Sequence, residues 1–169
     1  MNRTFVISDT HFGHKKILEF ESDNRPFSTI EYHDSELIKR WNDVVGKKDT
    51  VWHLGDVLFG RDSFSILPKL NGIKKLVMGN HDRYPCALYL EHFSQICGSA
   101  ELRNCILTHI PIHPEQFRRY KLNIHGHLHS RKMEDARYVN VSAEQINLTP
   151  ILLDKVIASN NLKENNATL

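Results

Sequence analysis

Short apolar runs recur along most of the chain, and each is bounded by glycine, asparagine, aspartate or serine. Runs of this length that are rich in valine, isoleucine and leucine favour β-strands. The predicted strands are Thr4–Ser8, Thr50–Leu54, Lys74–Met78, Glu101–Leu107, Leu122–His125 and Tyr138–Val141. Two of these runs are apolar almost throughout, which indicates strands that are covered on both faces.

Apolar positions at helical spacing occur between the strand-like runs. The clearest stripe comprises Leu37, Ile38, Trp41, Val44 and Val45. It predicts a helix over Thr29–Val45, with Ser28 and Glu31 forming a capping box and Gly46 ending the helix. Further helices are predicted over Lys15–Glu21, Asp62–Leu70 and Pro85–Phe93, and a last short one from Thr149-Pro150.

The order of these elements indicates the fold class. Strands alternate with helices at first and follow one another more closely towards the C-terminus, which predicts a layered α/β domain with a largely parallel first half and antiparallel pairing later. No repeat, linker or low-complexity tract interrupts the pattern. Residues 1–158 are therefore expected to form one domain, and the polar residues 159–169 a frayed tail.

Composition narrows the class of protein. The 169 residues are 40% hydrophobic and 25% charged, which is typical of a soluble globular chain. The formal net charge of +2 is too small to imply a polyanionic partner. Three cysteines without metal-type spacing read as thiols in a reducing compartment, and no apolar stretch reaches the length of a membrane span. A cytoplasmic protein with no membrane partner is expected.

Five groups of metal-binding residue types each follow a predicted strand. They are Asp9-Thr10-His11, Gly55-Asp56, Gly79-Asn80-His81-Asp82, Thr108-His109 and His125-Gly126-His127-Leu128-His129. Taken singly, each could be a turn, a cap or a structural histidine. In open α/β sheets, however, ligands bind just beyond the carboxyl ends of the strands, so the five groups are expected to meet. In an extended segment His127 and His129 point to one face.

The residue types indicate which metals and substrates fit. Carboxylate, amide and imidazole ligands without a thiolate suit Mn, Fe, Zn, Ni or Co rather than Ca or Mg alone. Seven candidate ligands are too many for one ion and fit two ions about 3.5–4 Å apart that share a carboxylate. Two divalent ions, two aspartates and a bridging hydroxide leave one positive charge. Such a site attracts an anion, and phosphate esters are the obvious class.

In their order along the chain, the five groups resemble the motifs of calcineurin-like metallophosphoesterases. The resemblance runs from Asp9 to about Ser142, and its most specific parts are the segments 7–14 and 79–82. The chain length is similar to that of small, minimal bacterial and phage members. The resemblance implies a four-layer α/β/β/α sandwich with two mixed sheets. It also implies two divalent metal ions, with Mn²⁺ as the first choice and Fe, Zn, Ni or Co as alternatives.

The resemblance also implies roles for particular residues. Asp9, His11 and His129 would hold the first metal, Asn80, His109 and His127 the second, and Asp56 would bridge the two. His81 would be the general acid that protonates the leaving alkoxide, and Asp82 would orient it. Two positions depart from the family pattern: Phe59 stands where many members carry a second acid, and Ile110-Pro111 follows His109 in place of a glycine. Neither departure removes a metal ligand.

Basic residues near these groups are candidates for contacts with the substrate. Arg25, beside Pro26, is the first choice for a phosphate contact, together with Arg83 and His14, although each could be ordinary surface charge.

Other residues near the groups have less specific interpretations. His53 and His125 are expected to support the site rather than bind metal, and His113 either lines the pocket or lies on a surface loop. Residues 117–120 form either a wall of the substrate cleft or a solvated connection with one buried aromatic side chain.

The predicted function is hydrolysis of phosphodiester or phosphomonoester bonds by a metal-bound hydroxide. A short chain leaves no room for a large cap domain, so an open site is expected, which favours nucleotide-like or cyclic nucleotide substrates. One alternative is a catalytically silent binding scaffold of the same fold, against which the complete ligand set and His81 argue. The other is a nuclease, but the small net charge argues against a stable nucleic-acid complex. A monomer or a homodimer is expected.

Overall fold

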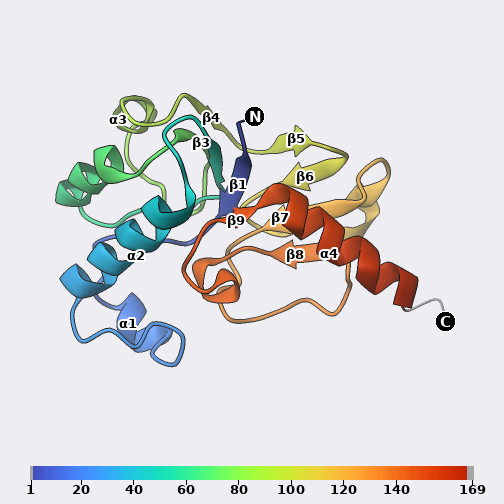
Figure 1. Ribbon diagram of the computed structural model, residues 1–169, viewed down its shortest axis with the longest axis horizontal. Coiled ribbons are helices and arrows are strands. Elements are labelled where there is room, and N and C mark those ends of the chain that lie inside the picture. Colours follow the sequence, from blue (N-terminus) through green and yellow to red (C-terminus); the bar gives the residue numbers. More distant parts are fainter. Residues whose placement is uncertain (1, 167–169) are drawn as a thin grey trace.

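The computed structural model describes residues 2–166, which form two β-sheets with helices packed around them (Figure 1). The strands are β1 (Thr4–Ile7), β2 (Thr50–His53), β3 (Ile73–Val77), β4 (Gln95–Cys97), β5 (Ala100–Leu102), β6 (Cys105–Leu107), β7 (Leu122–His125), β8 (Tyr138–Asn140) and β9 (Ile151–Leu152). The helices are α1 (Ile17–Phe20), α2 (Ile30–Val44), α3 (Cys86–Leu90) and α4 (Leu153–Asn166), with 3₁₀ helices η1 (Arg61–Lys69), η2 (Pro114–Phe117) and η3 (Ala143–Ile146).

The larger sheet has the strand order β4-β3-β2-β1-β9. Strands β1 to β4 pair in parallel, and β9 joins the edge beside β1 in the antiparallel direction. Phe5 and Ile7 pack on one face with Trp41 of α2, whereas Val6 packs on the opposite face with Ile124 of the second sheet. This alternation of apolar side chains places the larger sheet between a helical layer and the smaller sheet.

The smaller sheet has the order β5-β6-β7-β8 and differs from expectation in two ways. Residues 101–107 were expected to form one strand, but β5 and β6 are an antiparallel hairpin. Its two-residue turn is Arg103-Asn104, with φ of 52° and 62°, as a tight right-twisted hairpin requires. Antiparallel pairing was expected for the later strands, but β6, β7 and β8 pair in parallel. The long connections 108–121 and 126–137 make these parallel crossovers feasible.

The layers confirm the predicted fold class, an α/β sandwich with two mixed sheets. In Figure 1, α2, η1 and α3 lie on the side of the larger sheet away from the smaller one. The outer face of β7 is covered by the connection that contains η2, because Asn123 accepts a hydrogen bond from the Ile112 N–H and the Phe117 ring packs on Tyr138 at 5.0 Å.

Helix boundaries follow the predictions with local corrections. The side chain of Thr29, rather than Ser28, caps α2 by accepting from the Tyr32 N–H. The predicted helix over residues 62–70 is the 3₁₀ helix η1. The last helix does not begin at Pro150, because β9 intervenes and α4 starts at Leu153. Helix α4 then continues to Asn166, through residues expected to be a frayed tail, and residues 167–169 lie outside the described part of the chain.

Within residues 2–166, no helix is both long enough and apolar enough to cross a lipid bilayer.

Candidate metal centre

All five predicted ligand groups lie just beyond the carboxyl ends of β1, β2, β3, β6 and β7. The two sheets meet at this point, because Ser8 after β1 forms a parallel bridge with Ser142 after β8. The Ser8 N–H donates to Val141 O, and the Ala143 N–H donates to Ser8 O. Strand ends that are far apart in the sequence therefore converge at one edge of the sandwich.

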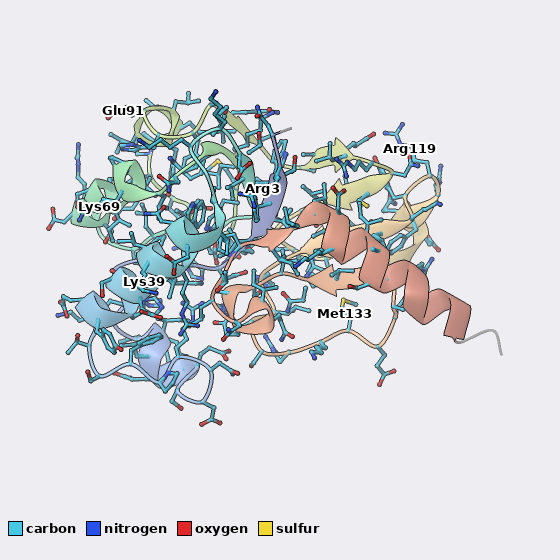
Figure 2. The ribbon with its side chains drawn as sticks, in the orientation of Figure 1. Arg3, Lys39, Lys69, Glu91, Arg119 and Met133 are labelled. Carbon is cyan, nitrogen blue, oxygen red and sulfur yellow. The ribbon has the colours of Figure 1, made fainter. Side chains whose placement is uncertain are left out.

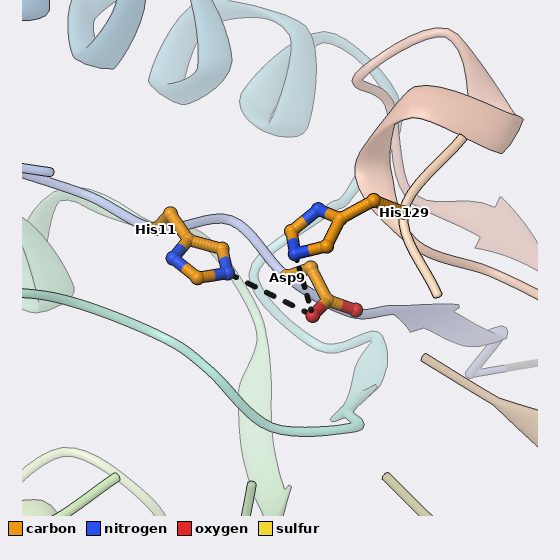
Figure 3. A group of neighbouring side chains, drawn as sticks. All are labelled: Asp9, His11 and His129. Atoms are coloured by element: carbon orange, nitrogen blue, oxygen red, sulfur yellow. Dashed lines mark ion pairs between the residues drawn. The ribbon is translucent and has the colours of Figure 1, made fainter. Parts of the chain in front are cut away.

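Asp9 is the centre of the first group of side chains. Its Oδ2 accepts hydrogen bonds from the His127 N–H and the Ser142 hydroxyl, both at 2.9 Å. Its Oδ1 has no hydrogen-bond partner among the described residues and lies 3.8 Å from His11 Nε2 and 3.8 Å from His129 Nε2 (Figure 3). One carboxylate oxygen is thus held by the protein, while the other faces two imidazole nitrogens.

Asp56 connects this group to a second one. Its Oδ1 accepts from the His81 N–H at 2.8 Å. Its Oδ2 lies 3.8 Å from His11 Nε2 and 3.4 Å from His109 Nε2. Because His11 belongs to the first group and His109 to the second, one oxygen of Asp56 faces both.

His109 has a defined tautomer in its neutral form. Its Nδ1 lies 2.8 Å from Leu54 O, which can only accept, so Nδ1 carries the proton. Its Nε2, 2.9 Å from Asn80 Oδ1, then has its lone pair directed towards a second acceptor. In neutral His109, the Nε2 lone pair and the Asn80 oxygen would repel each other. A proton on Nε2 or a cation beside both atoms would remove this repulsion. The His127 ring completes this group, with its centroid 5.1 Å from that of His109.

The pKa values of the aspartate and histidine side chains also indicate a site for positive charge. Burial raises the pKa of Asp9, but the neighbouring histidines His11, His109 and His129 outweigh it and hold that pKa well below its usual range. Burial lowers the pKa of His109, but Asp56 and Asp9 outweigh burial and leave it raised. Burial also raises the pKa of Asp56, but His109 outweighs burial and leaves it lowered. Asp9 and Asp56 therefore stay ionised and favour positive charge in the space between these side chains.

The backbone at this edge is strained. Five of the seven predicted ligands adopt left-handed φ angles: Asp9 (56°), His11 (51°), Asp56 (56°), His127 (69°) and His129 (50°). This conformation costs a residue with a side chain about 1 kcal/mol or more. Such strain persists where the surrounding structure enforces it, and it is typical of functional sites.

Two glycines let the main chain approach the carboxylates. A Cβ on Gly126 would lie 2.0 Å from Ser8 Oγ and 2.4 Å from Asp9 Oδ2. A Cβ on Gly79 would lie 2.2 Å from Asp56 Oδ1. Both clashes are too close to be relieved by small shifts, so the glycines of these two motifs are a steric requirement of the site.

The donor set fits divalent metal ions. Asp9 Oδ1 and both ring nitrogens of His11 are buried and have no hydrogen-bond partner in the described chain. Leaving such groups unpaired is costly, and a cation among them would remove that cost. Two groups of three residues bring one ligand atom from each member within 4.8 Å of the others. The first group is Asp9, His11 and His129, and the second is Asp9, Asp56 and His109.

Two residues, one predicted to contact the substrate and one predicted to orient His81, have other contacts. Arg25 was expected to contact phosphate, but its side chain is 0% exposed and its guanidinium binds Glu144, the carbonyls of Asp9 and Thr10, and His33. Asp82 was expected to orient His81, but its carboxylate accepts the N–H groups of Asp56, Val57 and Gly79. The phosphate contact expected of Arg25 is corrected, because its guanidinium is buried against these partners. The printed hydrogen bonds of Asp82 go to the backbone and to the Tyr89 hydroxyl rather than to the His81 ring, so its role towards His81 stays a prediction.

The other predicted side chains line the same region. The His81 ring is half-buried, and its centroid lies 5.1 Å from that of Phe59. The His14 ring stacks on the Phe59 ring, with their centroids 3.9 Å apart. Phe59, at the position of the missing second acid, thus forms an apolar surface between the two histidines. Arg83 is exposed, and its Nε donates to Asn80 O.

His53 and His125 each have one ring nitrogen with a hydrogen-bond partner and one buried ring nitrogen without a partner among the described residues. His53 is buried with its Nε2 2.9 Å from Thr10 Oγ1, and buried His125 donates from Nδ1 to Gly126 O. His113 is exposed and caps η2. Of residues 117–120, Phe117 is buried and Arg119 pairs with Glu101, as in a solvated connection with one buried aromatic side chain.

Ser142 and Glu144 were missed in the sequence. Ser142 donates to Asp9 Oδ2, and Glu144 Oε1 lies 3.0 Å from His129 Nδ1. The available signal was their position: both follow the predicted strand over residues 138–141, and that strand ends at the same edge as the others.

Relatives at the sequence level come from an archaeon and a phage. The chain is 34% identical to an uncharacterised protein of Methanocaldococcus jannaschii, over 93% of this chain and 90% of the relative. It is 31% identical to the Gene 66 protein of Mycobacterium phage L5, over 77% of this chain and 79% of the phage protein.

Solved structures share the fold. A protein of unknown function from Aquifex aeolicus matches with a TM-score of 0.77 and 26% identity, over 94% of this chain and 99% of that protein. An archaeal phosphodiesterase matches with a TM-score of 0.50 and 20% identity, over 83% of this chain and 82% of that protein. At that identity the second match speaks for the fold alone. The calcineurin-like phosphoesterase superfamily domain matches residues 3–145, and the chain belongs to that superfamily.

Proposed function

We propose that the protein is a dinuclear metal-dependent phosphoesterase that hydrolyses phosphodiester or phosphomonoester bonds, with nucleotide-like or cyclic nucleotide substrates. The observation that carries the proposal is the position of Asp56 Oδ2, which lies 3.8 Å from His11 Nε2 and 3.4 Å from His109 Nε2. A carboxylate oxygen that faces two separate imidazole groups is suited to bridge two ions.

The ligand assignment follows the two groups. Asp9, His11 and His129 would hold the first ion, Asn80, His109 and His127 the second, and Asp56 both. Mn²⁺ is the first choice, and Fe, Zn, Ni or Co also suit these ligands. When bound, the ions supply an activated water and offset charge on the phosphoryl oxygens.

His81 would serve as the proton donor to the leaving oxygen. Its backbone N–H binds Asp56 Oδ1, so the residue is tied to the shared carboxylate, while its half-buried ring remains accessible beside Phe59. Arg83 and His14 are the remaining candidates for substrate contacts. The Nη groups of Arg83 make no hydrogen bond within the described chain and could bind phosphate oxygens.

The test uses metal-stripped protein reloaded with Mn²⁺. Turnover of bis-p-nitrophenyl phosphate is compared with that of p-nitrophenyl phosphate, which separates diester from monoester preference. The expected result is Mn²⁺-dependent turnover. His81→Ala should lower it about 10²–10⁴-fold only for esters whose leaving oxygen needs a proton. His92→Ala is the matched control, since His92 is a half-buried histidine that packs on Phe64 of η1.

The leaving group provides a sharper check of His81. A nitrophenolate leaves readily without a proton, whereas the alkoxide released from a 2′,3′-cyclic nucleotide does not. His81→Ala should therefore lose more activity on the cyclic nucleotide than on the aryl ester. Equal losses on both substrates would contradict a role in proton donation. Protein that binds Mn²⁺ but turns over neither ester class would favour the binding scaffold.

The nuclease alternative can be separated in the same assay. The labelled basic side chains Arg3, Lys69 and Arg119 lie over different parts of the molecule in Figure 2, and the formal net charge is only +2. Polymer binding usually needs concentrated positive charge. We expect cleavage of mononucleotide esters to exceed that of oligonucleotides, and the reverse order would favour the nuclease. Whether the protein is a monomer or a homodimer stays a prediction.

A further inference from the structure

The side chain of Arg25 is wholly buried, and each of its three nitrogens has a hydrogen-bond partner. Nε donates to Glu144 Oε1 at 2.8 Å, Nη2 forms an ion pair with the same oxygen at 2.7 Å, and Nη2 donates to Asp9 O. Nη1 binds Thr10 O at 3.0 Å and His33 Nε2 at 2.9 Å. A buried guanidinium that is held by four hydrogen bonds and an ion pair is a fixed structural element.

Glu144 connects Arg25 to His129, which is a predicted metal ligand. Its side chain is 1% exposed, and the oxygen that binds Arg25 also lies 3.0 Å from His129 Nδ1. A carboxylate can only accept here, so Nδ1 of His129 carries a proton. Nε2, which faces Asp9 Oδ1 at 3.8 Å, then keeps its lone pair for a metal ion.

Arg25 also holds the strained turn that carries the other two ligands of this group. Asp9 and His11 have left-handed φ angles of 56° and 51°, and the carbonyls of Asp9 and Thr10 both bind the guanidinium. The network continues through the His33 ring, whose Nδ1 donates to Asp34 Oδ1 at 2.8 Å. Asp34 Oδ2 accepts the Gly13 N–H at 2.9 Å, so both sides of the turn are tied to α2.

The second ligand group has a different support. His109 is oriented by Leu54 O, and the Asp82 carboxylate holds the N–H groups of Asp56 and Gly79. Neither Arg25 nor Glu144 forms a hydrogen bond with a side chain of this group in the described chain. A change at Arg25 or Glu144 should therefore affect one ion and leave the other.

We infer that Arg25 and Glu144 are positioning residues that set the metal affinity of the Asp9–His11–His129 group and leave that of the Asn80–His109–His127 group unchanged. The inference rests on the proposed function, because it assumes that both groups bind metal. Hydrogen-bond partners of metal-bound histidines typically change metal affinity about 10- to 100-fold when they are replaced.

Calorimetric titration of metal-stripped protein with Mn²⁺ tests this inference. We expect two tight sites in the wild type. Glu144→Gln and Arg25→Lys should each keep one tight site and weaken the other about 10- to 100-fold. Excess Mn²⁺ should then restore turnover in these variants, whereas it should not in His129→Ala. Circular dichroism in EDTA identifies any variant that is unfolded.

Asp49→Asn is the matched control. It removes a buried carboxylate that also pairs with an arginine, Arg3, at 2.6 Å, but at the opposite end of β1. This variant should lose stability and keep two tight Mn²⁺ sites. If it weakens one site as Glu144→Gln does, the effect is one of general stability and the inference is overturned.

A measurement on the wild type covers variants that do not fold. In Zn²⁺-loaded protein, long-range proton–nitrogen NMR spectra should show His129 bound through Nε2 with a protonated Nδ1. Metal binding through Nδ1 would overturn the inference, as would two unchanged tight sites in Glu144→Gln. Wild-type protein that binds no Mn²⁺ would overturn the proposed function and the inference with it.

Discussion

Strand β1 has an arginine–carboxylate pair at each end, and the two pairs differ in their surroundings. At the amino end, Arg3 Nη2 lies 2.6 Å from Asp49 Oδ2, and the Arg3 side chain is 51% exposed. At the carboxyl end, Arg25 Nη2 lies 2.7 Å from Glu144 Oε1, and the Arg25 side chain is 0% exposed. The contacts are nearly equal in length, so the difference between the pairs is their burial and their neighbours.

Burial changes what an ion pair can contribute. An exposed pair usually adds at most about 1 kcal/mol of stability, because water screens it. A buried pair gains little net stability, since desolvation offsets the attraction, but losing one partner is strongly destabilising. Arg3 and Asp49 join the starts of β1 and β2, where only stability is at stake. Arg25 and Glu144 lie beside strained residues with unpartnered ligand atoms, so the role of this pair is to hold those ligands in position.

The largest expected effect is that of Asp56→Asn. The amide can still accept the His81 N–H, but the negative charge between His11 and His109 is lost. We expect both Mn²⁺ ions to bind weakly and turnover to fall about 10³-fold or more. This loss is larger than the loss that usually follows removal of one donor to the transition state. Mn²⁺ stoichiometry by mass spectrometry and turnover measure this. Asp62→Asn, at an exposed position of η1, is the control. One ion remaining tight in Asp56→Asn would contradict a shared role for Asp56.

The next effect is that of Asp82→Asn, which tests the second ligand group. Asp82 accepts three backbone N–H groups, and an amide cannot satisfy all of them. The free energy of unfolding should fall by about 1–3 kcal/mol, measured by urea denaturation. Mn²⁺ affinity should fall more at the Asn80–His109–His127 site than at the other, because Asp82 also holds Gly79, which precedes Asn80. Tyr89→Phe, which loses only a 3.4 Å contact to Asp82, should change little.

A different outcome would support the original expectation for Asp82. If Asp82→Asn lowers turnover while stability and Mn²⁺ affinity stay unchanged, Asp82 acts on His81.

The smallest effect is expected at the amino end of β1. Hydrogen bonds from Arg3 and Gly46 lower the pKa of Asp49 from 3.8 to about 2. A lowered pKa stabilises the fold above the unfolded-state value, and that contribution is lost as the pH falls towards 2. The free energy of unfolding of Asp49→Asn should therefore be about 1 kcal/mol lower than that of the wild type near neutral pH. The difference should shrink as the pH falls from 4 to 2.

Urea denaturation in EDTA across this pH range measures the difference. Asp43→Asn, which removes the exposed pair with Lys39, is the control and should show little change at any pH. A difference for Asp49→Asn that does not vary with pH would assign the effect to packing rather than to charge.

The amino-acid sequence by itself determined the strand runs, the α/β class and the family. It also placed Asp9, Asp56 and the histidines at strand ends, because apolar periodicity and polar residues at strand ends are local signals. It did not predict the hairpin at Arg103-Asn104, which a single apolar run concealed, or the parallel pairing of β6, β7 and β8, which depends on long crossovers.

The contacts of Arg25 and Asp82 were decided only by the tertiary structure. Arg25 stands beside a proline in a polar stretch that resembles a surface loop, and its partner Glu144 is 119 residues away. Residue type shows that a guanidinium can bind an anion, but not whether that anion is a substrate phosphate or a buried carboxylate. That choice depends on which segments pack together, because burial removes water as a competitor and leaves the nearest acceptor as the partner.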